Sequence, residues 1–221
     1  VFIAIIIIII FGFINTLGVN RGSAYNKFSS SVKITGLMLF CLIGLIMTNG
    51  DFSKLSESVS ATANLGPIGN IIAATMMIVF SFLGWDRVGY VAGEMKNPER
   101  VIPQSMFYGM LIVTTLYLGS NILYHSVIGL EGMRSSSIVA SDTAISLFGN
   151  IGASLISIMV IISATGSVNG TMMATTRVYY AMAKDGLIFK WFNFIHPKFH
   201  TPINAIIAHC SWSIILILIR Q

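Results

Sequence analysis

A short segment near the middle of the chain brings a glycine and two charges into an otherwise apolar run. After residues 71–79, the chain reads Phe80, Ser81, Phe82, Leu83, Gly84, Trp85, Asp86 and Arg87. Charged groups at membrane depth are costly and usually line a cavity or pair with each other. A helix interrupted there frees backbone carbonyls for an ammonium group, and the N-terminus of its second half attracts a carboxylate. The segment therefore predicts a site for a ligand that carries both groups, as an amino acid does.

A simpler interpretation of these residues stays open from the segment alone. The helix could end at Trp85, because tryptophan and flanking charges are common at the membrane interface. Asp86 and Arg87 would then be an interfacial pair, with each other or with groups on neighbouring helices. Both interpretations require the segment to lie in a membrane protein.

The composition supports that requirement. Of the 221 residues, 55% are hydrophobic and only 10% are charged, and the mean hydropathy is +0.82. An ordinary soluble domain has about a quarter of its residues charged. The composition excludes a disordered chain, a nucleic-acid binder built on a basic stripe and a disulfide scaffold. The two cysteines, Cys41 and Cys210, lie inside apolar stretches, where a thiol behaves as a small hydrophobe.

Uncharged runs predict an all-α membrane protein with six transmembrane helices in a single domain, residues 1–221. A spanning helix needs about 20 predominantly apolar residues. The first and sixth runs are near the lower limit, and the third is expected to be discontinuous. The chain lacks an initiator methionine, and we expect it to be truncated at both ends. The expected spans are approximately 1–19, 28–48, 68–95, 104–129, 143–176 and 203–219.

Basic residues set the expected orientation. The loops after the first, third and fifth spans carry most of them, including a connection from Arg21 to Lys33, whereas the other loops hold only Lys54 and Arg134. By the positive-inside rule, the first set is cytoplasmic. The net charge of +5 therefore reports topology. Lys33 taken alone is a flanking lysine whose ammonium reaches the interface.

Four segments in order resemble the amino acid–polyamine–organocation (APC) superfamily, most closely its L-type amino acid transporter and bacterial permease branches. FSFLGWDRVGYVAGEMKNPERVIP (80–103) resembles the sixth-helix signature of that family, and GSVNGTMMATTRVYYAMAKDG (166–186) resembles the end of its eighth helix. HPKFHTP, within 195–202, is similar to the loop into the ninth helix, and 15–33 to the connection from the fourth helix into the fifth. The ordered set covers nearly the whole chain.

The resemblance implies a partial LeuT-type inverted-repeat fold, with this chain corresponding to helices four to nine. It implies that the carbonyls of Phe80, Ser81 and Leu83, beside Gly84, bind the substrate amino group, and that the Phe80 ring acts as a gate. Relatives often carry a small residue where this chain has Leu83, which leaves the size of the substrate open.

Lys33 aligns with a lysine whose ammonium, in sodium-independent members of the family, stands where sodium-coupled relatives hold an ion. The resemblance therefore implies a coupling role for Lys33 and disfavours coupling to sodium. A desolvated lysine can change its protonation state, which suits such a role. Asp86 directly follows Gly-Trp and could favour a cationic substrate.

The expected function is a sodium-independent secondary transporter that moves amino acids by alternating access, as a permease or exchanger. The alternatives are a polyamine or cationic amino acid antiporter, and a transporter-like sensor or subunit that does not transport. No enzyme is expected, because no catalytic set is visible, and the lone His125 and His209 give no metal site. We expect a multi-pass protein of the plasma membrane with an amino acid substrate and no cofactor. An accessory subunit and the oligomeric state stay open.

Overall fold

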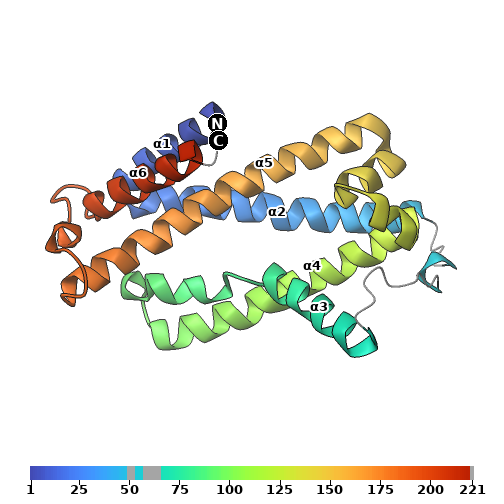
Figure 1. Ribbon diagram of the computed structural model, residues 1–221, viewed down its shortest axis with the longest axis horizontal. Coiled ribbons are helices and arrows are strands. Elements are labelled where there is room, and N and C mark those ends of the chain that lie inside the picture. Colours follow the sequence, from blue (N-terminus) through green and yellow to red (C-terminus); the bar gives the residue numbers. More distant parts are fainter. Residues whose placement is uncertain (49–52, 57–65, 220–221) are drawn as a thin grey trace. The chain divides into compact units, whose positions relative to one another are not determined.

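Helices make up the regular secondary structure of residues 1–48, 53–56 and 66–219, which this computed structural model describes. In these residues there is no β-strand, so the expected all-α class is confirmed for the described part of the chain. The 3-10 helices are labelled η. In chain order (Figure 1) the elements are α1 (Phe2–Thr16), α2 (Val19–Met47), η1 (Ser53–Ser56), α3 (Gly66–Ser81), η2 (Trp85–Glu94), α4 (Pro98–Ser135), α5 (Val139–Lys184), η3 (Lys190–Asn193) and α6 (Ile203–Ile219).

Four helical segments are long and apolar enough to cross a membrane: α2, α3 with its continuation to Gly93, α4 and α5. The helices α1 and α6 are also apolar but shorter. Large apolar side chains are exposed along these helices, as at Ile46, Met77 and Leu118. Such a surface suits lipid, and a helix satisfies its own backbone hydrogen bonds there. The expected spans 104–129 and 143–176 lie inside α4 and α5, and 203–219 has the bounds of α6.

The basic segment 21–33 is helical, so the connecting loop expected before the second span at residue 28 was wrong. The helix α2 begins at Val19, directly after Gly18, whose φ of 121° lets the chain turn away from α1. Residues 19–33 contain no proline, and their small and polar side chains do not interrupt helical hydrogen bonding. Lys33 therefore lies at the midpoint of α2.

Two long helices change direction at glycines with positive φ. Gly129 interrupts α4 with φ 69°, and Gly149 interrupts α5 with φ 64°. The expected fourth span ends at the first of these breaks. The ammonium of Lys54 donates a 2.7 Å hydrogen bond to the carbonyl of Val127, two residues before Gly129. Lys54 thus satisfies a helix carbonyl next to the break.

The chain divides into two compact units, each of which has its own packing. Unit 1 contains residues 1–33, 88–98 and 159–221. Its core joins Phe11 of α1, Met172 of α5 and Ile206 of α6, and the rings of Phe11 and Tyr25 lie 4.8 Å apart. The antiparallel neighbours α1 and α6 lie side by side within this unit (Figure 1).

Unit 2 contains residues 34–87 and 99–158. Its core forms where the second half of α2 packs against α4 and the first half of α5. A Cβ added at Gly44 would lie 2.6 Å from Leu123 Cδ1 and 3.1 Å from Leu147 Cδ1, so the three helices approach closely only because this residue has no side chain. The ring of Phe40 contacts those of Tyr124 and Phe148, with centroids 6.5 and 6.3 Å away.

Candidate functional site

The interruption expected after residue 80 is present in unit 2. The helix α3 ends at Ser81, a turn covers residues 82–84, and η2 begins at Trp85. Gly84 adopts a φ of 100°, a conformation that a residue with a Cβ rarely takes. The α-helix ends three residues before this glycine, whose positive φ lets the chain turn from α3 into η2. The α-helix therefore does not continue through Trp85.

The carbonyls at the break already have partners within the protein. The Phe80 carbonyl accepts from the Leu83 N–H at 3.2 Å, and the Gly84 carbonyl accepts from the Arg87 N–H at 3.3 Å. The Ser81 carbonyl accepts from the hydroxyl of Tyr117, on α4, at 3.1 Å. A carbonyl oxygen has two lone pairs, so each of these oxygens keeps capacity for a further donor.

An open groove of about 630 Å³ lies beside the break, between α3 and α4. The end of α3 and the turn after it contribute Ser81 and Phe82 to the lining, and α4 contributes Thr114, Tyr117 and Asn121. Apolar side chains of both helices complete the walls. The rings of Phe82 and Tyr117 meet edge to face, with centroids 5.3 Å apart. The groove thus combines apolar walls with a few hydroxyl, amide and carbonyl groups, which is the composition typical of a small-molecule site.

The structure separates the site residues that the sequence predicted. Ser81 lines the groove, whereas Phe80 and Leu83 do not, and their side chains are 75% and 66% exposed. Asp86 and Arg87 follow Trp85 in the first turn of η2, and their side chains are exposed. The role of Phe80 as a gate and that of Asp86 in charge selectivity stay predictions.

Sequence reasoning missed the contribution of α4 to the groove. Thr114, Tyr117 and Asn121 are polar residues within the fourth apolar run, spaced by three and four positions. That spacing puts them on one face of a helix. The periodic polar positions could have indicated a polar face on this span, although not the partner that it contacts.

Lys33 lies in unit 1, on the face of α2 that packs against α5. Gly22, Asn26, Ser29 and Lys33 follow one another at spacings of four, three and four, so they share a face. Ser29 Oγ donates to the Ile162 carbonyl at 2.9 Å, and a Cβ added at Gly166 would overlap the Ser29 side chain. Lys33 is half-buried one turn beyond Ser29. The coupling role of Lys33 stays a prediction.

Asn169 of α5 joins this face of α2 to α1. Its side chain is fully buried. Its Nδ2 donates to the Gly22 carbonyl and to Asn26 Oδ1, both at 2.8 Å, and its Oδ1 accepts from Asn15 Nδ2 at 2.7 Å. All the donors and an acceptor of this amide are thus used between helices. The packing role expected for a polar residue among small neighbours in a membrane helix matches this geometry.

Among the residues that the structure describes, no group of three or more His, Cys, Asp and Glu side chains is placed to hold a metal ion. The groups that the groove offers are hydrogen-bond acceptors and donors next to an interrupted helix. Such an arrangement is suited to reversible binding of a polar small molecule.

Apolar helices of membrane-crossing length, with large apolar side chains exposed along them, are typical of an integral membrane protein. The chain belongs to the amino acid permease family, whose model matches residues 1–220. The resemblance to the APC superfamily and its L-type branch is thereby confirmed.

The relatives that the chain resembles are named as amino acid transporters or exchangers. The chain is 33% identical to the serine/threonine exchanger SteT of Bacillus subtilis (strain 168), over 99% of this chain and 49% of the exchanger. It is 26% identical to the human cystine/glutamate transporter, over 88% of this chain and 38% of that protein. It is also 26% identical to the mouse large neutral amino acids transporter small subunit 2, over 97% of this chain and 40% of that protein. The chain spans about half, or less, of the length of these relatives.

Proposed function

We propose that this chain takes part in secondary transport of amino acids, as a permease or exchanger working by alternating access. The observation that carries the proposal is the break of α3 at Gly84, which puts the Ser81 carbonyl beside an open groove. A carbonyl at the end of an interrupted helix accepts well from an ammonium group, because no helical N–H follows to occupy it. The carbonyls of Phe80 and Leu83 would add to this seat for the substrate amino group, and the Phe80 ring would close over it.

The names of the relatives support an amino acid as substrate. They mention serine, threonine, cystine, glutamate and large neutral amino acids. These molecules differ in their side chains but share an α-ammonium and an α-carboxylate. We therefore assign the break at Gly84 to the shared groups, and we expect residues elsewhere to distinguish the side chains.

Lys33 supports coupling without sodium. It lies in the interior of α2, on the face that packs against α5. An ammonium in that position would supply a positive charge where a bound cation would otherwise be needed, so it would repel a sodium ion.

The proposed fold is a LeuT-type arrangement in which all six apolar helices of this chain span the plasma membrane.

The carboxylate of Asp86 supports a second candidate function, that of an antiporter of cationic amino acids or polyamines. Its exposed carboxylate stands two residues after Gly84 and would attract a second positive charge on the substrate. An Asp86→Asn variant of the full-length protein separates the candidates. Loss of transport for arginine or putrescine, with neutral amino acids unaffected, would favour the antiporter, and equal transport of both classes would exclude it.

The main proposal is tested by transport in proteoliposomes made with the full-length protein. We expect saturable uptake of at least one radiolabelled amino acid, faster when the lumen holds unlabelled amino acid, and unchanged when choline replaces sodium. Absence of both uptake and counterflow across all the proteinogenic amino acids would contradict it. Saturable binding without flux would point instead to a sensor, and a requirement for sodium would remove the role assigned to Lys33.

A further inference from the structure

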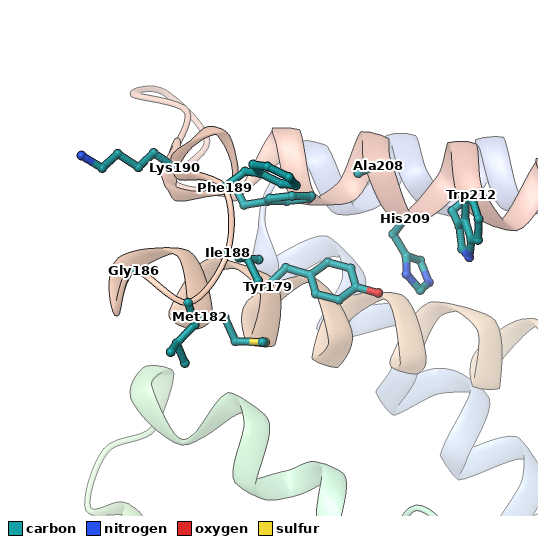
Figure 2. A pocket seen from close by; sticks show the side chains of 11 residues that line it. Tyr179, Met182, Gly186, Ile188, Phe189, Lys190, Ala208, His209 and Trp212 are labelled. Atoms are coloured by element: carbon teal, nitrogen blue, oxygen red, sulfur yellow. The ribbon is translucent and has the colours of Figure 1, made fainter.

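A larger groove lies at the end of α5, within unit 1 and apart from the break in α3. Its volume is about 860 Å³. It is lined by the last turns of α5, the segment that follows them and the first half of α6 (Figure 2). The residues that define it are Tyr179 on α5, Phe189 and Lys190 in the connection, and Ala208, His209 and Trp212 on α6.

The groove lies between the segment that follows α5 and one face of α6. On α6 its lining runs from Ala208 to Trp212, which is about 6 Å along a helix. Figure 2 shows Lys190 at one end of the groove, with its ammonium directed away from it, and Trp212 at the other end.

The chemistry of the walls differs along this length. Most of the lining side chains are apolar or aromatic, and the polar exceptions are Tyr179, Lys190 and His209. Among the lining residues, Lys190 alone carries a permanent charge. Residues 177–200 contain four cationic side chains, Arg177, Lys184, Lys190 and Lys198, against the single carboxylate of Asp185. The end of the groove at Lys190 thus carries a positive charge, whereas most of its lining suits hydrocarbon.

Two polar side chains that line the groove, those of Tyr179 and His209, form no hydrogen bond with the described residues. The rings of Tyr179 and His209 lie 6.1 Å apart, and Figure 2 shows the Tyr179 hydroxyl directed toward the imidazole. Both are available to an acceptor or donor on a ligand.

We propose that this groove binds an anionic phospholipid, with one acyl chain along Phe189, Ala208 and Trp212 and the phosphate next to Lys190. Hydrocarbon matches the apolar walls, and the negative headgroup matches the cationic end. Lysine beside a membrane surface attracts anionic lipid, and its long side chain can bend back to the phosphate.

The test uses the full-length protein in nanodiscs that contain phosphatidylcholine with a minor fraction of photoactivatable lipid. The probe is phosphatidylglycerol with a diazirine in one acyl chain, and cross-linked peptides are located by mass spectrometry. We expect labelling of the peptides that contain Phe189, Ala208 and Trp212. Unlabelled phosphatidylglycerol should compete better than unlabelled phosphatidylcholine.

Two variants tie the labelling to the groove. Ala208→Trp fills it and should abolish the labelling, whereas the control Ile207→Trp puts the same side chain on an exposed neighbouring position and should leave it intact. Lys190→Gln should lower the preference for phosphatidylglycerol over phosphatidylcholine about five-fold, as expected for one lysine at a membrane surface. Lys190→Gln changes no packing residue, so it still tests the proposal if the Ala208→Trp variant fails to fold.

Three results would overturn the proposal. Labelling that is absent from the groove peptides would mean that another segment of the protein occupies it. Labelling that survives Ala208→Trp would place the lipid elsewhere. Equal competition by the two lipids, with no effect of Lys190→Gln, would mean that the groove takes hydrocarbon without recognising the anionic headgroup.

Discussion

The hydroxyl of Tyr117 donates a 3.1 Å hydrogen bond to the carbonyl of Ser81, the last residue of α3. This contact ties α4 to the break at which a substrate amino group is proposed to bind. The phenol is a neutral donor, and a charge-assisted hydrogen bond from an ammonium is about twice as strong as a neutral one. A bound substrate would therefore displace the Tyr117 hydroxyl or share the Ser81 carbonyl with it.

Replacing Tyr117 with phenylalanine removes the hydroxyl and keeps the ring that contacts Phe82. If the hydroxyl competes with the substrate, the half-saturation concentration for amino acid uptake should fall about five-fold, because a typical hydrogen bond contributes about 1 kcal/mol. Initial rates over a range of substrate concentrations in proteoliposomes measure this change. Tyr108→Phe, an exposed tyrosine on the same helix, serves as the control. An unchanged or raised half-saturation concentration would show that Tyr117 does not compete.

Asn169 should contribute strongly to the stability of unit 1. Asn169→Leu removes the acceptor of Asn15 and the donor to the Gly22 carbonyl and to Asn26 Oδ1, so each of these groups loses one partner. Leaving a buried polar group unpaired costs about 1–3 kcal/mol, whereas a hydrogen bond between membrane helices contributes about 0.6 kcal/mol on average. We expect a loss of about 2 kcal/mol, visible as a lower midpoint of thermal unfolding in detergent.

The control for Asn169 is Asn150→Leu, an exposed asparagine on the same helix. It should leave the unfolding midpoint nearly unchanged. If the two variants unfold at the same temperature, the asparagine network of α1, α2 and α5 has no net stabilising effect.

The close approach of α2 and α5 depends on Gly166. A Cβ at this position would overlap the Ser29 side chain, so Gly166→Ala should separate the helices and lower stability by about 1–3 kcal/mol. Ser29→Gly removes the opposing atoms and should restore part of the loss in the double variant. Gly109→Ala is the control, because a Cβ there meets no atom within 4 Å. Additive effects of the two substitutions in thermal unfolding would mean that Gly166 and Ser29 do not share one contact.

The sequence was sufficient to predict where most helices lie, because long uncharged runs are stable in lipid only as helices. The last expected span has the bounds of α6, and the break at Gly84 was visible as a glycine and two charges inside an apolar run. The start of α2 at Val19 was missed. Polar residues at 19–33 resemble a loop until α5 is known, since Asn169 satisfies the polar groups that face it.

The site was predictable only in part for a similar reason. Ser81 could be identified from its place at the break, but its partner Tyr117 follows 36 residues later on another helix. That contact depends on how α3 and α4 pack, which no local pattern encodes. Phe80 and Leu83 were singled out from the resemblance, but neither residue lines the groove in unit 2, and both are exposed.

Lys33 offers the sharpest test of how transport is driven. In Lys33→Gln the side chain keeps most of its length and loses its charge, so a coupling role predicts a fall in maximal uptake rate of about ten-fold or more, in sodium and in choline alike. Lys27→Gln is the matched control, because Lys27 is an exposed lysine on the same helix, six residues earlier. The half-buried charge of Lys33 should be the more sensitive of the two, since an exposed lysine contributes little through solvent-screened interactions. If Lys33→Gln and Lys27→Gln transport equally well, Lys33 has no coupling role, and the driving force of transport must lie elsewhere.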